Sequence, residues 1–449
     1  MSQRKLMAVL SLAAAVALTA GESQASKSRV ESMSLTVPTL SQFTDDYVNI
    51  YYYPASVVRQ NNLVLAELGN NPTGAVDTGV FSASTVTFDE QSYTVIRNFP
   101  RIGAIAFQMK QSALNNPLAS GSLNNEQLDA IWGKAFSKFD FAVRLDMTNS
   151  SLEVTDTAAP ATFNRARGDG LNPFDPYPFG GVFLPDLILA SPLGAVEINT
   201  FGITPGITIH MSNDNRIEGA VTYRKYSLDR SASTGGVAGE TWKDDGSASY
   251  SVLGRAFLNQ GDRHVWVPAA WYTNDDLSWR VTGVLATPVS ADEKYKSYGI
   301  GLSDNMRVND NNLLLWGVQV AQAKHTYERK DTGNLGAADQ SKLEEKTTFL
   351  PLVFAAIETD ATRWLKVRIG ANRALVSNRT EDTTFGPPAT VTTDKERTSA
   401  FNFSLGTGIR WNNLDIDMTM NEKFPLTGGY ILSGDRSSPF TRASATYHY

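Results

Sequence analysis

The chain has 449 residues, a formal charge of −6 and no cysteine. The acidic balance argues against general nucleic-acid binding, which needs a basic face. The lack of cysteine excludes disulfides, thiolate nucleophiles and zinc–thiolate sites. Hydrophobic residues make up 42% of the chain and the mean hydropathy is −0.23, values that exclude a helical membrane protein and suit an exported β-protein.

Residues 1–25 are predicted to be a cleaved signal peptide. Arg4 and Lys5 form a short basic start, and an apolar stretch follows over 6–20. That stretch is shorter than the roughly 20 residues that a membrane-spanning helix needs. Small residues stand before position 26, as signal peptidase requires. An uncleaved N-terminal anchor is the alternative.

Residues 26–70 are expected to form an N-terminal hatch or a periplasmic segment. An acidic pair runs into aromatic residues and then Pro-Ala, in the run DDYVNIYYYPA over 45–55. This pattern resembles the N-terminal hatch of the long-chain fatty acid transport family of outer-membrane barrels, although Tyr53 stands where that family has Asn and Ser56 where Gly is usual. The resemblance implies a 14-stranded barrel with its N-terminus folded inside. The alternative is a segment that only seals the barrel mouth. The hatch residues proposed to contact a ligand are Tyr51, Tyr52, Tyr53 and Pro54.

Two stretches further along do not follow a strand pattern. Residues 124–132 are predicted to form a short amphipathic helix with an Asn cap. Residues 148–193 are predicted to form a long loop, because proline at the density found over 172–185 cannot sit in a central strand. This loop either constricts the lumen or faces outward, and a cap without a ligand is the alternative. Its candidate ligand contacts are Arg165, Arg167, Phe174, Tyr177 and Phe179.

Most of the remaining chain alternates between apolar and polar residues. Successive strand side chains point to opposite faces, so each such run presents one apolar and one polar stripe. The clearest runs are 139–146, 217–224, 277–285, 365–370, 401–411 and 414–420. A soluble sandwich would share this alternation, but charged polar faces and aromatic residues at strand ends favour a membrane barrel. Residues 71–449 are therefore predicted to form an all-β, single transmembrane antiparallel barrel of about 14 strands, with 12 or 16 as alternatives.

The connections between the runs also support a barrel. Tight turns are predicted at 274–276 and 412–413, and long polar loops at 228–246, 328–345 and 379–397. Short turns at one end and long loops at the other are typical of outer-membrane barrels.

The polar stripes predict which charges line the lumen. The candidates are Arg144, Arg224, Arg255, Arg280, Lys366, Arg368, Arg410, Asp140, Asp415 and Asp417, together with Asp146 and Glu218. Lumen charge tunes what passes a barrel, but the signs are mixed, so no ion preference follows. Pairing across strands, in a network that holds the hatch, is the alternative use of these charges.

The four histidines do not predict catalysis. His210 lies near Ser212 and Asp214, but alternate residues of one strand stand about 7 Å apart, too far for direct hydrogen bonds. No nucleophile elbow, zinc-binding helix motif or phosphate-binding loop occurs. We therefore expect no enzyme activity, no metal and no cofactor.

The final run, residues 440–449, alternates and ends on an aromatic residue. It resembles the closing strand of bacterial outer-membrane barrels, in which the terminal aromatic residue is read by the assembly machinery, here through Tyr447 and Tyr449. The resemblance implies the outer membrane of a diderm bacterium. The expected partners are outer-membrane lipid, lipopolysaccharide, the barrel assembly machinery and a small-molecule solute, without nucleic acid.

These patterns favour a passive channel or transporter for small or hydrophobic solutes. The aromatic stretches 47–55 and 171–185 suggest a path for a long-chain acid, whose carboxylate would meet Arg165 and Arg167. The alternative is a structural or surface-binding barrel with a closed lumen. The oligomeric state is left open by the sequence.

Overall fold

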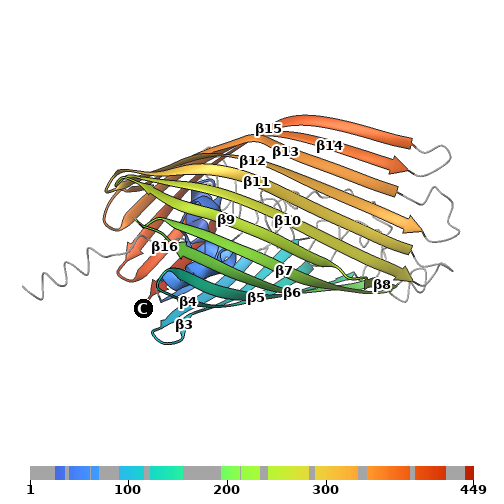
Figure 1. The fold of residues 1–449 in the computed structure, drawn as a ribbon, viewed down its shortest axis with the longest axis horizontal. Helices are drawn as coiled ribbons and strands as arrows, with labels where there is room; N and C mark the ends of the chain where they lie inside the picture. Colours follow the sequence, from blue (N-terminus) through green and yellow to red (C-terminus); the bar gives the residue numbers. More distant parts are fainter. Residues whose placement is uncertain are drawn as a thin grey trace, which may run out of the picture.

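A computed structural model describes residues 26–35, 40–60, 62–69, 90–115, 122–154, 194–212, 214–232, 241–282, 289–331, 341–384, 390–420 and 440–449. The predicted signal peptide and residues 155–193 of the predicted loop lie outside these ranges. One antiparallel sheet closes on itself, because its last strand pairs with its first (Figure 1). Within the described residues, no helix is both long and apolar enough to cross a membrane.

The wall follows the chain in order. Its strands are β1 (Leu63–Gly69), β2 (Glu90–Phe99), β3 (Gly103–Asn115), β4 (Ser122–Ala135), β5 (Phe139–Val154), β6 (Gly194–His210), β7 (Arg216–Ala232), β8 (Thr241–Asp244), β9 (Ala248–Gln260), β10 (His264–Thr282), β11 (Val289–Asn309), β12 (Asn312–Asp331), β13 (Ser341–Asp360), β14 (Leu365–Thr384), β15 (Thr390–Trp411), β16 (Leu414–Met420) and β17 (Phe440–His448). The long β10–β15 make one side of the wall taller than the other (Figure 1).

The barrel has sixteen strand positions. Both β8 and β9 lie between β7 and β10, so these two segments share one position in the wall. The predicted all-β, closed antiparallel barrel is confirmed. The strand number is at the top of the predicted range rather than at 14, and it is even, as expected for a single-chain bacterial barrel.

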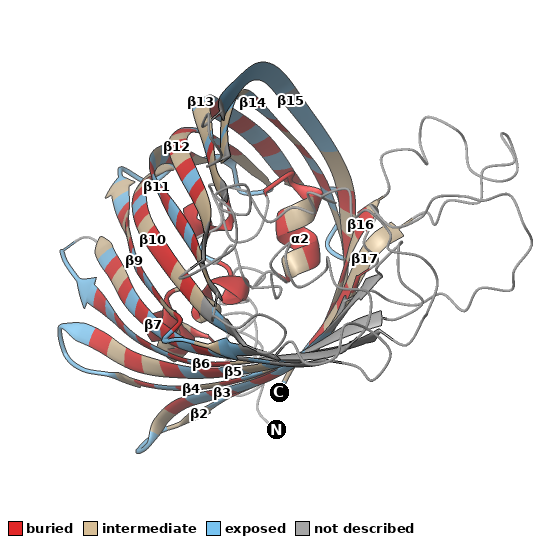
Figure 2. Cartoon of the chain, turned by 90° about the vertical axis from the view of Figure 1, so that its right-hand side faces the viewer, coloured by how far each residue is buried: buried red, intermediate tan, exposed pale blue. Residues whose placement is uncertain are grey.

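Alternation along each strand separates the two faces of the wall. On β9, for example, Ser251 is buried and Val252 is exposed, and Figure 2 shows the same striping on most strands. In a barrel that spans a membrane, the exposed apolar side chains face lipid and the buried polar ones face the interior. The sequence periodicity therefore assigns the two faces correctly in most runs.

Two predicted elements are wrong. Residues 124–132 belong to β4, which pairs with both β3 and β5, so they form no helix. Residues 274–276 lie inside β10 rather than in a turn. The first prediction rested on local helix pattern and the second on a polar run that resembles a turn, whereas a polar barrel interior accepts acidic residues within strands: Asp129 and Asp275 are both buried.

The tight connections lie at one end of the barrel. The predicted turn at 412–413 is present, and Asn412 has φ 55°, in the left-handed region that Asn tolerates. The C-terminus lies at this same end in Figure 1.

The predicted long loops are wrong over much of their length. Strands include residues 148–154, 228–232, 241–244, 328–331, 341–345, 379–384 and 390–397, so the wall extends further than the polar composition indicated. The segments 233–240, 332–340 and 385–389 lie outside the described residues.

An N-terminal segment, which we call the plug, occupies the interior at the end with the tight turns. It comprises residues 26–60, with 36–39 outside the description, and includes α2 (Lys27–Ser32), η1 (Ser41–Phe43), η2 (Tyr47–Tyr51) and η3 (Pro54–Arg59). Figure 2 shows α2 inside the ring of strands. Because β1 already belongs to the wall, the plug ends before Leu63 rather than at the predicted residue 70.

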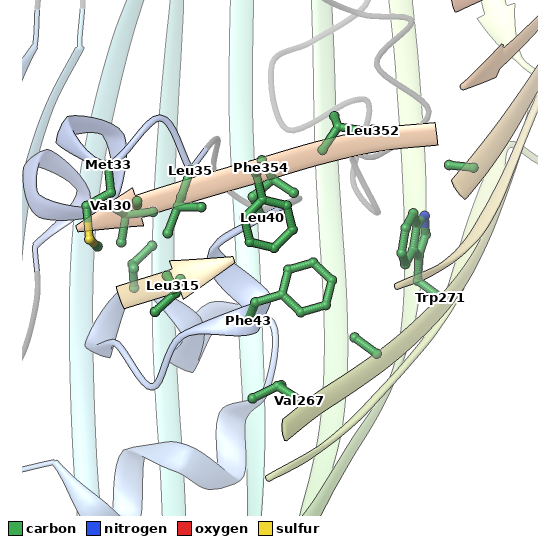
Figure 3. Close-up of a cluster of buried hydrophobic side chains, with 14 of the residues drawn as sticks. Val30, Met33, Leu35, Leu40, Phe43, Val267, Trp271, Leu315, Leu352 and Phe354 are labelled. Carbon is green, nitrogen blue, oxygen red and sulfur yellow. The ribbon is translucent and has the colours of Figure 1, made fainter. Parts of the chain in front are cut away.

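Apolar side chains of the plug pack against two parts of the interior wall, one on β9, β10 and β12–β14 and the other on β1–β5. Phe43 stacks on Phe354 of β13, with ring centroids 5.3 Å apart. Figure 3 shows these rings beside Leu40 and Leu315. At Gly370 the wall comes so close that a Cβ would collide with the carbonyl oxygen of Met33. Burial of such side chains contributes about 1.5–3 kcal/mol each, which favours the docked plug.

Candidate functional site in the plugged lumen

Three clusters of charged residues join the plug to the wall. The first, which we call the α2 anchor, comprises Arg29 and Asp46 of the plug with Glu358, Arg368 and Asp417 of the wall. Arg29 donates to both carboxylate oxygens of Glu358, from Nε at 2.6 Å and from Nη2 at 3.0 Å. A second bond from Arg29 reaches Asp46. Arginine forks of this kind fix orientation as well as adding energy.

The wall side of the α2 anchor continues the same network. Arg368 donates to Glu358 and to Asp417, both at 2.6 Å. Asp417 also accepts from the hydroxyl of Ser26 at 2.8 Å. All five anchor residues are buried, so each charge depends on its partners rather than on water.

Burial also alters the titration of the plug residues in this anchor. It raises the pKa of Asp46 to about 6, against the opposing pull of Arg29 and the hydrogen bond from Thr44. Burial alone would lower the pKa of Arg29, but Asp46 and Glu358 outweigh it and raise that pKa above its usual range. Arg29 therefore stays charged, while Asp46 is poised to take up a proton in mildly acidic conditions.

The second cluster, the η3 anchor, comprises Arg59 of the plug with Glu218, Arg255 and Asp140 of the wall. Arg59 contacts Glu218 directly and lies 3.8 Å from Asp140. Arg255 pairs with Glu218 at 2.7 Å and donates to the plug carbonyls of Gln42 and Thr44, at 2.8 and 2.9 Å. One wall arginine thus holds the plug backbone while its partner carboxylate holds Arg59.

The third cluster surrounds η2. Arg144 donates to the carbonyl oxygen of Tyr51 at 2.6 Å and pairs with Asp129, also at 2.6 Å. The Tyr51 hydroxyl bonds to Thr94, at 2.8 Å. Tyr47 donates to Glu67 at 2.6 Å. Burial raises the pKa of both tyrosines well above its usual value, so both keep their hydroxyl protons.

The structure places most of the predicted lumen charges on the interior face. Arg144, Arg224, Arg255, Arg368, Asp140, Asp415 and Asp417 are buried. Lys366 and Arg410 are partly buried and pair with Asp360 and Asp415, at 3.1 and 2.9 Å. Several of these charges contact the plug, an arrangement that matches the alternative prediction of a charge network that holds the hatch.

Arg280 is a correction. Its side chain is 59% exposed and pairs with Asp245 at 3.1 Å. It lies on the face of β10 opposite to the buried Asp275 and Leu277. The expectation placed Leu277 on the lipid face, but continuous alternation through β10 puts Leu277 inside and Arg280 outside.

The predicted hatch residues lie in the plug. Tyr53 is buried, with its ring 4.2 Å from the Arg255 guanidinium carbon, and Pro54 begins η3 beside Gly206 of β6. Tyr51 and Tyr52 are partly buried. The loop candidates Arg165, Arg167, Phe174, Tyr177 and Phe179 lie outside the described residues. Near the C-terminus, Tyr447 and Tyr449 are exposed.

Sequence reasoning missed the plug side of the anchors. Arg29 and Arg59 were not singled out, nor was Glu358. The sequence did contain a sign of this role: Arg29 and Arg59 are the two arginines of residues 26–60, most of which are uncharged. An arginine that is buried inside a barrel needs a carboxylate partner. Their partners stand 329 and 159 residues away in the chain, so the pairing itself was not predictable from local pattern.

Each histidine contacts a carboxylate. His210, His264, His325 and His448 contact Asp140, Asp304, Glu293 and Asp415, at 2.9, 2.8, 2.6 and 3.4 Å. His210 therefore pairs across strands rather than with Ser212 or Asp214. Across the described part of the chain, no group of three or more His, Asp or Glu residues is arranged to hold a metal ion.

No family model and no curated protein matches this chain. Among solved structures it is similar to the ferric-catecholate import receptor Fiu of E. coli K12, with 9% identity, coverage of 87% of this chain and 82% of that chain, and a TM-score of 0.36. It is also similar to the alcaligin outer-membrane receptor FauA of Bordetella pertussis, with 7% identity, 87% and 76% coverage and a TM-score of 0.38. We draw no functional argument from likenesses at this level.

Proposed function

We propose that this chain is an outer-membrane transporter whose plug closes the lumen and must shift before solute passes. The observation that carries the proposal is that ion pairs hold both halves of the plug, a buried pair of Arg29 with Glu358 and a pair of the partly buried Arg59 with the buried Glu218. Apolar packing would hold a permanent plug equally well, because replacing buried ion pairs by hydrophobic residues is often neutral or stabilising. Ion pairs suit a part that has to separate and return.

The width of the barrel supports transport. About eight strands suffice for a barrel filled by its own side chains, whereas barrels of about 16 strands enclose an aqueous channel. A sixteen-stranded wall therefore encloses more space than a closed structural barrel needs. In this chain the plug occupies part of that space.

The interior wall carries both apolar and polar stretches, which supports an amphiphilic solute. Apolar wall residues that cluster with the plug lie on β9, β10 and β12–β14, including Trp271 and Phe354, and on β1–β5, including Ile131. The strands between these two stretches, β6 and β7, carry buried threonines such as Thr204 and Thr222. A long-chain acid matches this division better than an inorganic ion does. Uptake of a labelled fatty acid by cells lacking their own transporter, with and without residues 171–185, tests this finer proposal.

A reversible tether tests the movement itself. The hydroxyls of Ser34 in the plug and Ser404 in β15 lie 3.0 Å apart, so S34C with S404C places two thiols within reach of each other. The chain has no other cysteine, so no competing disulfide forms. We expect oxidation to abolish solute uptake and reduction to restore it.

A matched pair of cysteines controls for disulfide formation in the barrel. The side chains of Gln322 and Thr348 lie 3.3 Å apart on β12 and β13, on the face opposite the buried Ala321 and Ala323. Q322C with T348C therefore joins wall to wall without holding the plug. Uptake by this variant should not respond to oxidation. Equal uptake by the oxidised and reduced S34C/S404C protein would overturn the moving-plug proposal.

A closed structural barrel is the second candidate. It is favoured by contacts of the plug around much of the ring, since α2 touches β14–β17, η1 touches β10 and η3 touches β3–β6. Planar-bilayer recordings separate the two candidates. Brief openings of the intact protein support a transporter. A barrel that remains silent, and that supports no uptake in cells, supports the structural role.

A further inference from the structure

A hollow of about 820 Å³ lies on the outer face of the wall over β2–β7. We call it the outer-wall groove. Most of the side chains that line it point away from the lumen: Tyr93, Met109, Met147 and Phe201 are 50–61% exposed. Their chain neighbours Thr94, Gln108 and Asp146 are buried on the interior side and do not line the hollow. The groove is therefore separate from the plugged lumen.

Strand register arranges the lining in two parallel rows. Directly opposite residues on successive strands form an apolar row of Tyr93, Met109, Leu128, Met147 and Phe201, which ends at Lys225. A second, polar row lies two residues further along each strand from the apolar row. It contains Gln91, Gln111, Glu126, Asn149, Asn199 and Ser227. Both rows line the same hollow.

The rows mark one boundary of the lipid-facing band. On the side of the tight turns, the next row remains apolar and includes Val95, Phe107, Leu145 and Ile203. On the other side the polar row follows at once. An apolar band bounded by polar residues is the expected pattern at the membrane interface, here the interface at the barrel end opposite the tight turns.

We propose that the outer-wall groove binds an outer-leaflet glycolipid. Acyl chains would lie over the apolar row, and sugar hydroxyls would bond along the polar row. Amide side chains both donate and accept, which matches hydroxyl groups, and Gln91 already donates to Gln111 at 2.8 Å. A phosphate-bearing headgroup would be expected to meet several arginines or lysines, whereas the outward-facing rows carry one cation, Lys225, and one anion, Glu126.

Lipid binding to the intact barrel provides the test. The protein is purified in a non-glycosidic detergent and titrated with glucosyl-diacylglycerol, phosphatidylethanolamine or phosphatidylglycerol of the same acyl chains, and bound lipid is counted by native mass spectrometry. We expect glucosyl-diacylglycerol, whose headgroup carries no phosphate, to bind at least tenfold more tightly than either phospholipid. Equal binding of all three lipids would overturn the proposal.

Substitutions locate the binding. The double variant Q111M/N149L keeps side-chain volume but removes amide hydrogen bonds. We expect its affinity for glucosyl-diacylglycerol to fall about tenfold and its affinity for phosphatidylethanolamine to stay unchanged. L128W/M147W fills the groove without adding charge, and it should reduce binding further. Heat-modifiable mobility on gels checks that both variants form barrels.

A matched control uses an outward-facing amide elsewhere. Gln322 on β12 lies outside the groove and accepts from the exposed Tyr298 hydroxyl at 2.6 Å. Q322M should leave glucosyl-diacylglycerol binding unchanged. Loss of binding equal to that of Q111M/N149L would show a non-specific effect and overturn the assignment. The assignment would also be overturned if this chain formed a dimer that the groove variants dissociate.

Discussion

The two halves of the plug are attached to the wall in different ways. η3 ends at Arg59, a few residues before β1 begins at Leu63, so the chain itself ties it to the wall. α2 has no such short link to a strand and relies on its anchor, in which Arg29 contacts Glu358. A short tether keeps a segment at high effective concentration beside its site. Loss of an ion pair should therefore free α2 much more readily than η3.

The largest expected effect comes from Glu358→Ala. It leaves Arg29 and Arg368 without their shared carboxylate inside the barrel, and breaking a buried pair by removing one partner costs about 3–5 kcal/mol. We expect α2 to leave the wall and bilayer conductance to rise. Loss of the Arg29 contact should also expose a cysteine placed at Ser34 to a thiol reagent.

The control for that change is Glu381→Ala. Glu381 and Arg379 both belong to β14 and pair at 2.8 Å, but both side chains are exposed. Exposed pairs contribute about 0–1 kcal/mol, so conductance should stay at the level of the unmodified protein. Similar conductance for the two alanine variants would contradict the role assigned to the α2 anchor.

Arg59→Ala sharpens the comparison from the other half. Glu218 keeps Arg255 and Arg216 as partners, at 2.7 and 2.8 Å, so its charge stays compensated. We expect a lower unfolding temperature on heat-modifiability gels, from a loss of about 1–3 kcal/mol, with little change in conductance. An open channel in this variant would mean that η3 is not held by its chain connection.

A pH effect should distinguish the halves further. The pKa of Asp46 is about 6 in the docked plug against an ordinary 3.8, so docking takes up a proton between these values. Docking is then most stable below pH 4 and weakens as the pH rises through about 6. Between pH 5 and pH 7 the docking equilibrium should change by about tenfold.

Asp46→Asn isolates that effect, because it keeps the shape of the side chain without titrating. Conductance of the unmodified protein should be lower at pH 5 than at pH 7, and this difference should disappear in D46N. A pH response that survives the substitution would assign it to another group. Recording conductance across this pH range in both proteins makes the comparison.

The smallest expected effect comes from Arg280→Ala. Arg280 is exposed on the outer face, far from the plug contacts. We expect conductance and thermal stability to match those of the unmodified protein, within about 0–1 kcal/mol. A clear change in conductance would instead indicate that Arg280 faces the lumen.

Sequence pattern predicted the wall far better than the site. Alternation assigned Arg144, Arg224 and Arg368 to the polar face, and all three are buried. It failed at Arg280, because the acidic run at 274–276 looked like a turn and broke the count along β10. It also failed at 124–132, where pairing with two neighbouring strands overrides local helix preference.

The sequence alone determined that this protein has a wall of alternating strands with one polar and one apolar face, because side-chain direction in a strand follows from residue number alone. It also indicated that residues 26–70 lie apart from that wall, although β1 already begins at Leu63. Only the tertiary structure decided the sixteen positions, the shared position of β8 and β9, and the pairing of Arg29 with Glu358. These depend on register and closure, which bring together residues hundreds of positions apart and leave no local trace in the chain.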